Sequence, residues 1–165
     1  NYVDESELSG VSLVGSCNPE LFKKLIKNIS KEERRLELNG DGKSVPFDKI
    51  VKSYSKADWL AGLAIFPKTR HYSRKRLTKF FEYMAAGLPI IYSDFPEWKA
   101  FLEPLNVGIS VNPEKPEEVA QAISSLKRSP ELRTQMSNNG QKAVSLNYNW
   151  EREENKLFEL YESLT

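Results

Sequence analysis

Cysteine and histidine are almost absent from this sequence, which contains one of each, Cys17 and His71. One cysteine excludes a disulfide within the chain, and this pair cannot supply the four ligands of a closed zinc site. The sequence also lacks a signal-peptide pattern and any apolar run of about 18 residues, the length that a membrane-spanning helix needs. We therefore expect a reducing, cytoplasmic setting, with attachment to a membrane surface left open.

An excess of charge of one sign is lacking too. Lysine and arginine total 24, and aspartate and glutamate total 23. The chain therefore has no overall field that would attract nucleic acid or an anionic membrane. We expect no nucleic acid partner, and any cationic site has to be local.

Apolar residues, by contrast, make up 39% of the 165 residues, enough to bury one sizeable core. The first ten residues are polar and acidic and begin with Asn1 rather than Met, which is typical of a linker or of the cut end of a longer chain. We predict such a segment over residues 1–10 and a single domain over residues 11–165.

Short apolar runs alternate with helical patterns throughout this domain. The runs that suit buried strands span residues 11–14, 36–38, 60–66, 90–92 and 107–111. Apolar residues at helical spacing occur in four segments: Leu21, Phe22, Leu25, Ile26 and Ile29; Phe47, Ile50, Val51 and Tyr54; Val119, Ala120, Ile123 and Leu126; and Leu157, Phe158, Tyr161 and Leu164. Repeated strand, helix, strand units predict right-handed crossovers. The fold class is therefore α/β, a doubly wound, Rossmann-like parallel sheet with helices on both faces.

Ligands of such folds bind beyond the carboxyl ends of the strands. The loops that follow predicted strands span residues 15–18, 39–43, 67–78 and 93–97. We expect a binding site to be built from these loops.

The stretch over residues 78–91 is the most informative part of the sequence. It is Thr-Lys-Phe-Phe-Glu-Tyr-Met-Ala-Ala-Gly-Leu-Pro-Ile-Ile, the pattern of a short helix that ends at glycine and proline and leads into a strand. Thr78 and Glu82 share one face, which puts a carboxylate near the electropositive amino end of the helix. The predicted core face consists of Phe80, Phe81, Met84 and Ala85.

The amino end of this helix is a ready anion site. Free amide groups near Thr78 and Lys79 could hold a diphosphate, and Glu82 could accept hydrogen bonds from ribose hydroxyls. The candidates for added countercharge are Arg74, Lys75, Arg76 and Lys79. The alternative for each of these residues is an ordinary solvated side chain.

Residues 79–89, Lys-Phe-Phe-Glu-Tyr-Met-Ala-Ala-Gly-Leu-Pro, resemble the Lys-x-x-Glu-Tyr-Met-Ala-x-Gly-x-Pro segment of the retaining family 4 glycosyltransferases of bacterial type. Further segments match that family in the same order. They span residues 14–16, 39–42, 107–113, 138–140 and 148–151. The resemblance thus covers roughly residues 11–164.

The resemblance implies that this chain is the C-terminal half of a GT-B fold and binds a UDP- or GDP-sugar donor. A missing N-terminal domain would bind the acceptor, a glycan or a lipid-linked molecule, so the isolated chain would be inactive. No metal or other cofactor is expected. The full-length protein would belong to bacterial polysaccharide biosynthesis in the cytoplasm, where peripheral association with the inner face of the membrane stays open.

Two positions depart from the family pattern. Glu82 matches the second glutamate of a signature in which seven residues separate two glutamates, and this second glutamate binds the ribose. Arg74 occupies the position of the first, so the donor sugar is contacted otherwise or the loop register differs. The loop after the first strand begins with Ser16 where the family usually has a cation for the diphosphate. The candidates to replace that cation are Lys23, Lys24 and residues 74–76.

Transfer requires stabilisation of the negative charge that develops on the departing nucleoside diphosphate, which positioned cations and amide dipoles provide. We predict that Arg74 and Lys79 do this catalytic work. The predicted substrate-binding residues are Glu82, Thr78, Lys75, Arg76, Gly15, Ser16, Gly40 and Gly42. The last two glycines could let the backbone approach the base, although a glycine-rich turn after a strand is common.

The tryptophans and the final helix are expected to serve packing rather than ligand binding. We expect Trp59, Trp98 and Trp150 to lie in the core or between domains. We also expect the final helix to expose an apolar surface where the absent domain docks, because GT-B chains cross back at this point.

Two other functions fit the sequence. A non-catalytic nucleotide-sugar-binding module fits the presence of Arg74 in place of a signature glutamate, and activity of the full-length protein distinguishes it from an enzyme. A doubly wound scaffold or interaction domain with an unused cleft fits the fold pattern alone. Soaking crystals with nucleotide tests that third possibility.

Overall fold

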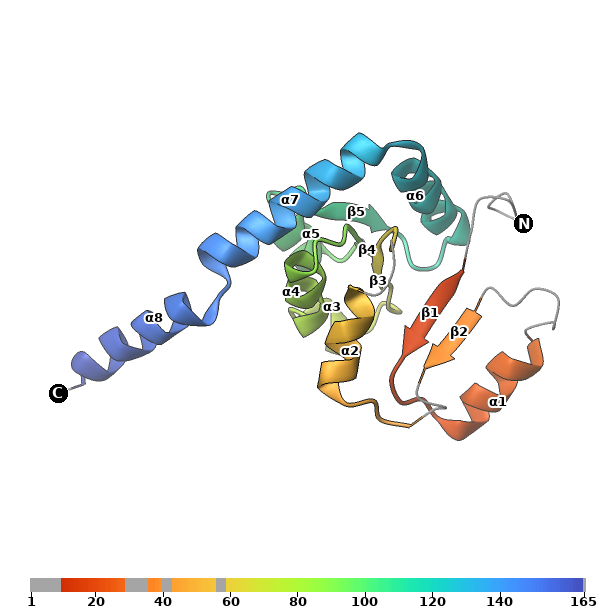
Figure 1. The fold of residues 1–165 in the computed structure, drawn as a ribbon, viewed down its shortest axis with the longest axis horizontal. Helices are drawn as coiled ribbons and strands as arrows, with labels where there is room; N and C mark the ends of the chain where they lie inside the picture. Colours follow the sequence, from red (N-terminus) through yellow and green to blue (C-terminus); the bar gives the residue numbers. More distant parts are fainter. Residues whose placement is uncertain (1–9, 29–35, 40–42, 56–58, 165) are drawn as a thin grey trace. The chain divides into compact units, whose positions relative to one another are not determined.

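The computed structural model describes residues 10–28, 36–39, 43–55 and 59–164. The chain forms two compact units that divide between Asp58 and Trp59. Their helices and strands are labelled in Figure 1.

The first unit contains two parallel strands and two helices. Its elements are β1 (Val11–Val14), α1 (Pro19–Asn28), β2 (Leu36–Asn39) and α2 (Phe47–Tyr54). Val11 of β1 is opposite Leu36 of β2. Helix α1 begins after Asn18, whose Oδ1 accepts a hydrogen bond from the Glu20 amide at 2.8 Å and so caps the helix. Both strands and both helices predicted for this stretch are therefore present, while Ile29, Gly40 and Gly42 lie outside the described residues.

The second unit is built on a three-stranded parallel sheet in the order β3-β4-β5. Its elements are β3 (Gly62–Ala64), α3 (Arg70–Ser73), α4 (Thr78–Ala85), β4 (Ile90–Ser93), α5 (Pro96–Leu102), β5 (Gly108–Val111), α6 (Pro116–Arg128), α7 (Pro130–Asn147) and α8 (Trp150–Glu162). The register places Ala64 opposite Tyr92 and Ser93 opposite Val111. All five strands predicted from the sequence are thus observed, and all pair in parallel.

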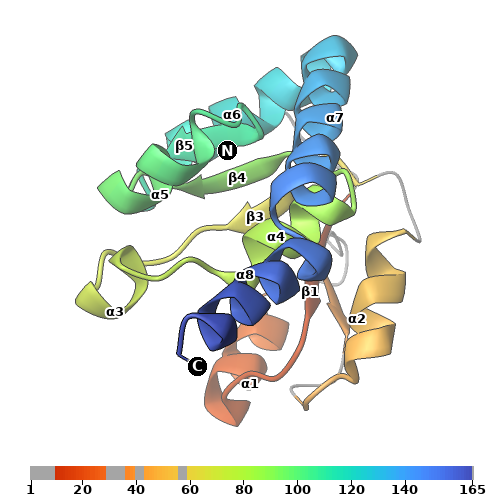
Figure 2. The ribbon, with the colours of Figure 1, turned by 90° about the vertical axis from the view of Figure 1, so that its left-hand side faces the viewer.

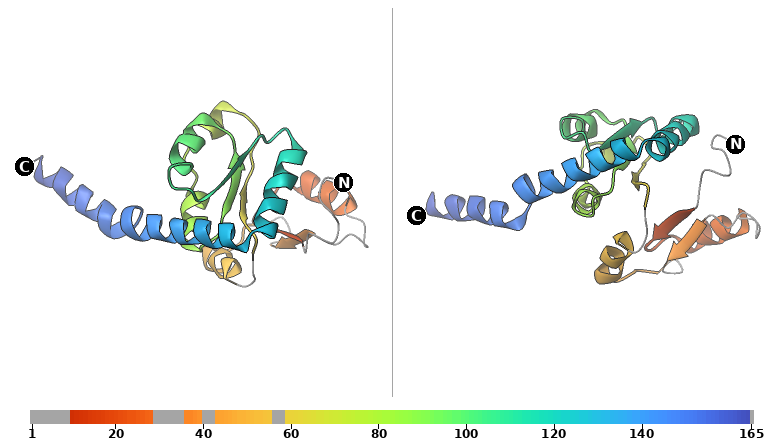
Figure 3. Two further views of the ribbon diagram at one scale, coloured as in Figure 1. Left: turned by 90° about the horizontal axis from the view of Figure 1, so that it is seen from above. Right: turned by 45° about the horizontal axis from the view of Figure 1, so that its top comes forward.

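Strand β4 divides the core of this unit into two layers. Ile90 and Tyr92 pack with α4 and α5, whereas Ile91 packs with α6 on the other face. This alternation follows from the two-residue period of a strand. All four residues of β4 are buried, as expected for a central strand with helices on both faces. The left view in Figure 3 shows the strands between α4 and α5 on one side and α6 on the other.

Helix α4 ends in a glycine turn. Gly87 has φ +70°, its amide donates to the Met84 carbonyl, and the Leu88 amide donates to the Tyr83 carbonyl. These two bonds satisfy carbonyls that the last helical turn leaves without partners. The Gly-x-Pro of the sequence therefore terminates the helix as predicted.

Three local expectations were wrong. Strand β3 is shorter than residues 60–66, because the Phe66 amide and carbonyl both bond to Ser93 Oγ, at 2.9 and 3.0 Å, instead of continuing the ladder. Ala85 is exposed, since the buried side of α4 centres on Phe80 and Met84. The loop over residues 67–78 contains the short helix α3, whose first turn is capped by Thr69 Oγ1. Figure 2 shows α3 at the tip of the connection between β3 and α4.

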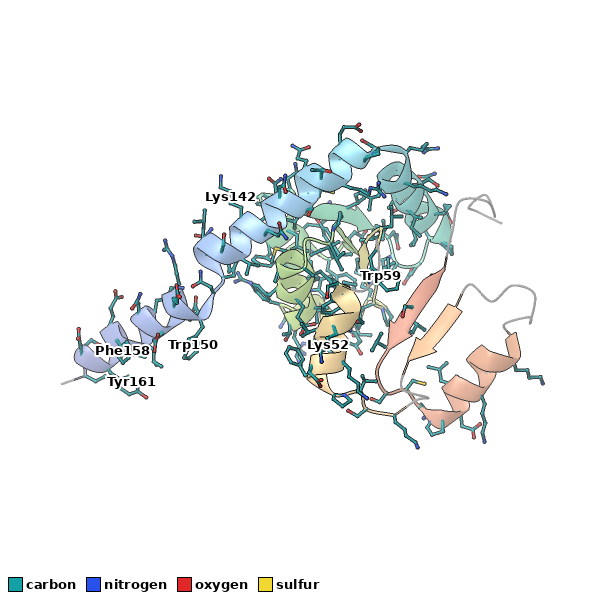
Figure 4. The ribbon with its side chains drawn as sticks, viewed as in Figure 1. Lys52, Trp59, Lys142, Trp150, Phe158 and Tyr161 are labelled. Atoms are coloured by element: carbon teal, nitrogen blue, oxygen red, sulfur yellow. The ribbon has the colours of Figure 1, made fainter. Side chains whose placement is uncertain are left out.

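The side chain of Asn149 connects α7 with α8. Asn149 Oδ1 accepts from the Arg152 amide at 3.0 Å, and Asn149 Nδ2 donates to the Ser145 carbonyl at 2.7 Å. The same residue thus caps the start of α8 and the end of α7. Helix α8 carries exposed apolar side chains, as predicted for the final helix. Figure 4 draws Trp150 and Tyr161 on the same side of it.

Candidate functional site

Helix α4 has a buried side and an opposite side that carries the two polar residues predicted to bind the ligand. Phe80 and Met84 are fully buried. Glu82 lies midway between them in sequence, which places it on the opposite side, because two residues turn an α-helix through about 200°. Thr78 shares this side and is exposed, whereas Glu82 is half-buried. The predicted pairing of Thr78 with Glu82 on one face is therefore observed.

The amino end of α4 carries no side-chain cap. Leu77 occupies the cap position in an extended conformation, and the side chains of Thr78 and Lys79 are exposed. The first amides of a helix lack intrahelical partners and carry its positive dipole end. This end of α4 can accept an anion.

Burial and the negative charge of Glu82 affect the pKa of Tyr83. Burial raises the pKa of the Tyr83 phenol, and the negative charge of Glu82 raises it further. The Tyr83 hydroxyl also lies 3.4 Å from the Leu63 carbonyl of β3. Tyr83 therefore contacts β3 through its hydroxyl, and its phenol stays protonated.

The cationic loop, residues 67–77 between β3 and α4, carries three of the predicted basic residues, at positions 74 to 76. Arg74, at the end of α3, and Lys75 are exposed. Lys75 Nζ lies 3.3 Å from Nε2 of His71. The Arg76 guanidinium instead stacks over the Phe101 ring, with Cζ 4.6 Å from the ring centroid. Of the three predicted loop cations, Arg76 alone has this packing contact within the described residues.

Two anchors of this loop were not predicted from the sequence. Ser93 is fully buried at the end of β4 and bonds to both backbone groups of Phe66. Trp98 donates from Nε1 to the Lys75 carbonyl at 2.7 Å. The sequence predicted a packing role for Trp98, which is 1% exposed, and placed Ser93 in a loop after a strand, but it indicated neither hydrogen bond.

The remaining predicted site residues belong to the first unit. Gly15 has φ +131°, with open space where a β-carbon would lie, and Ser16 is exposed in the same loop after β1. The positive φ explains why glycine occupies this position. Gly40 and Gly42 fall outside the described residues.

The described part of the chain lacks a metal-binding cluster and a membrane-spanning helix. It contains no group of three His, Cys, Asp or Glu side chains placed to hold a metal ion. None of its helices has both the length and the apolar character needed to cross a membrane.

Comparison with solved structures finds the same architecture in glycosyltransferases. Sucrose-phosphate synthase from Thermosynechococcus elongatus aligns with a TM-score of 0.70 and 22% identity over 93% of this chain and 38% of its own. WaaG, a glycosyltransferase involved in lipopolysaccharide biosynthesis, aligns with a TM-score of 0.66 and 17% identity over 88% of this chain and 37% of its own. The fold is therefore the α/β fold of GT-B glycosyltransferase domains, and the chain spans less than two fifths of either protein.

Comparison at the level of sequence identifies the family. No curated protein matched the chain. The glycosyl transferase-like family matches residues 19–159, which include α4 and the loop before it. The match covers well over half of the sequence, and the chain accordingly belongs to the glycosyl transferase-like family.

Proposed function

We propose that this chain is the donor-binding, C-terminal domain of a retaining glycosyltransferase of family 4, of bacterial type. It binds a UDP- or GDP-sugar, and an N-terminal domain binds the acceptor, a glycan or a lipid-linked molecule. Neither half catalyses transfer alone. We place the full-length enzyme in the cytoplasm, in polysaccharide synthesis, with peripheral contact to the inner membrane face as its means of reaching lipid-linked acceptors.

The observation that carries this proposal is the arrangement around the amino end of α4. The uncapped end, the exposed Lys79 and the half-buried Glu82 one turn later belong to a single helix. The cationic loop leads directly into that helix. A diphosphate needs amide donors and countercharge, and a ribose needs a carboxylate acceptor at a fixed distance from them.

Each residue then has a physical task. Thr78 and Lys79 bind the diphosphate at the helix end, and Glu82 accepts from the ribose hydroxyls. Arg74 and Lys79 stabilise the charge that develops on the leaving diphosphate, which requires no covalent chemistry by the protein. Lys75 adds countercharge, while Arg76, stacked on Phe101, supports the loop that carries them.

We also propose donor-binding roles for four residues of the first unit, taken from the family resemblance. Gly15 and Ser16 approach the diphosphate, and Gly40 and Gly42 approach the base. The alignment of sucrose-phosphate synthase over 93% of this chain supports treating both units as one nucleotide-sugar-binding domain. Residues 1–10 then serve as a linker.

Calorimetric titration tests the proposal. The full chain is titrated with UDP, GDP and their sugars, beside Glu82→Gln and the matched control Glu117→Gln, which changes an exposed carboxylate on α6. We expect saturable binding of one nucleotide series, weakened about 10-fold or more by Glu82→Gln, because a hydrogen bond to a charged group contributes roughly 1.5–3 kcal/mol. Absence of binding to all ligands, or equal effects of the two substitutions, would contradict it.

A non-catalytic sugar-nucleotide-binding module is the second candidate. The observation that favours it is the exposed Arg74 at the position of the first signature glutamate. Both candidates predict nucleotide binding. They differ in whether the full-length protein releases UDP or GDP from the sugar nucleotide when an acceptor is supplied.

A further inference from the structure

The cationic loop between β3 and α4 is tied to helix α5 by a buried indole. Trp98 Nε1 donates a hydrogen bond of 2.7 Å to the carbonyl oxygen of Lys75. Residues 74 and 76, on either side of that carbonyl, carry two of the loop's positive charges. The bond therefore holds the backbone at the centre of the charged segment.

The tryptophan itself is immobilised by its neighbours. It is 1% exposed, and its ring packs against the rings of Phe80, Phe95 and Phe66 at centroid distances of 5.0, 4.7 and 6.0 Å. Phe80 lies in the first turns of α4, so one indole contacts both the helix and the loop that precedes it. Movement of the loop relative to α4 would break the bond or disturb this packing.

Further contacts hold the two ends of the loop. Both backbone groups of Phe66 are hydrogen-bonded to Ser93 Oγ. The centroid of its ring lies 4.6 Å from that of the Tyr72 ring in α3. At the other end, Arg76 stacks on Phe101. These contacts hold the backbone that carries the exposed cations Arg74 and Lys75. They do so although like charges at neighbouring positions repel one another.

We propose that Trp98 is a positioning residue that holds the cationic loop in register with the amino end of α4. The inference rests on the proposed function, because it assigns the loop to a nucleoside diphosphate. A loop held in its binding geometry before the ligand arrives loses less conformational entropy on binding, which raises affinity without any new contact. Trp98 itself does not touch the ligand.

Limited trypsin digestion tests the anchor without any ligand. The loop provides cleavage sites after Arg74 and Arg76, and cleavage after Arg128, between α6 and α7, serves as the internal reference. Trp98→Phe keeps an aromatic ring and removes the N–H donor. We expect cleavage in the loop to accelerate about 5-fold relative to the reference, the factor that one ordinary hydrogen bond represents.

Trp98→Phe removes both a hydrogen bond and part of the buried side-chain volume, and a matched variant distinguishes the two effects. Phe95→Leu leaves a cavity in the same aromatic cluster and retains the Trp98 donor. We expect it to lower the thermal midpoint with little change in the cleavage ratio between loop and reference. Equal acceleration in both variants would overturn the assignment to the hydrogen bond.

The binding experiment uses whichever of UDP and GDP binds the unsubstituted chain, together with its nucleoside. Trp98→Phe is expected to weaken the diphosphate several-fold and to leave the nucleoside unchanged. Faster cleavage with unchanged diphosphate affinity would overturn the proposal. If neither nucleotide binds the unsubstituted chain, the proposed function fails, while the digestion still measures the anchor.

Hydrogen exchange of the indole N–H signals tests the anchor with no substitution at all. The Trp98 signal should exchange far more slowly than that of Trp150, whose side chain is 68% exposed. Exchange of Trp98 as fast as that of Trp150 would overturn the proposal even if Trp98→Phe failed to fold.

Discussion

Gly140 of α7 lies directly against Met84 of α4. A β-carbon at position 140 would be 3.1 Å from the Met84 Cα and 3.3 Å from its Cβ. Both residues are buried, so the two helices approach each other backbone to backbone at this point. The position of α4, and with it the candidate site, depends on a residue without a side chain that lies 56 positions further along the sequence, in α7.

Gly140→Val tests this close approach. We expect it to lower the free energy of unfolding by about 2–3 kcal/mol, because α4 and α7 have to separate to admit the side chain. Gln135→Val, at an exposed position of the same helix, is the control for helix propensity and should cost less than about 1 kcal/mol. Urea denaturation followed by circular dichroism measures both, and equal losses would contradict the close-packing argument.

Lys79 is expected to contribute to nucleotide affinity through its charge. Lys79→Gln should weaken the bound nucleoside diphosphate by about 10-fold, in line with one charge-assisted hydrogen bond. Lys142→Gln, at an exposed position of α7 labelled in Figure 4, removes the same charge away from α4 and should have little effect.

Salt dependence provides a second measure of the Lys79 contribution. The difference in affinity between Lys79→Gln and the unsubstituted chain should shrink as the salt concentration rises from 0.05 to 0.5 M. The Debye length falls from about 14 to about 4 Å over this range, so exposed charges are screened more strongly. Calorimetry at both concentrations measures it. A difference that stays constant would show that Lys79 acts by packing rather than by charge.

Tyr92, buried in the core beside β5, should make stability fall at alkaline pH. Burial, with a smaller effect of the Glu103 charge, raises the pKa of its phenol to about 12, whereas a hydrogen bond with Ser110 opposes the shift. A raised folded-state pKa means that the folded protein retains a proton which the unfolded chain loses above about pH 10. The stabilisation is complete below pH 10 and is lost as pH rises toward 12.

In Tyr92→Phe, the free energy of unfolding is therefore expected to fall less as the pH is raised. At about pH 11 the native chain should have lost roughly 1 kcal/mol more than the variant, relative to pH 8. Denaturant titrations of both proteins at the two pH values measure the difference. A parallel decline in the two proteins would show that Tyr92 titrates equally in the folded and unfolded states.

The exposed apolar side of α8 should make the chain associate. Trp150, Phe158 and Tyr161 are 68%, 57% and 62% exposed, and apolar surface on this scale is usually covered by a partner. We expect concentration-dependent association in sedimentation velocity, reduced by replacing the three residues with Gln. Replacing Arg152 and Glu159 of the same helix with Gln is the control, and a chain that is monomeric at every concentration would contradict the expectation.

The secondary structure, and the side of α4 on which Glu82 lies, followed from local sequence. The apolar runs placed all five strands, and helical spacing placed α1, α2, α6 and α8, because a two-residue and a 3.6-residue period bury different side chains. The boundaries of α4 followed from Thr78 and from the glycine turn at Gly87. Which side of α4 carries Glu82 could likewise be read from its spacing to Phe80 and Met84.

Contacts between distant segments were decided by tertiary structure alone. The bonds of Ser93 with Phe66 and of Trp98 with Lys75 join residues 27 and 23 positions apart, and they determine where β3 ends and how the cationic loop is held. The stacking of Arg76 on Phe101 and the exposure of Ala85 have the same origin. A periodic pattern indicates which side of a helix or strand is apolar. The segment that packs against that side is determined by the tertiary fold of the whole chain.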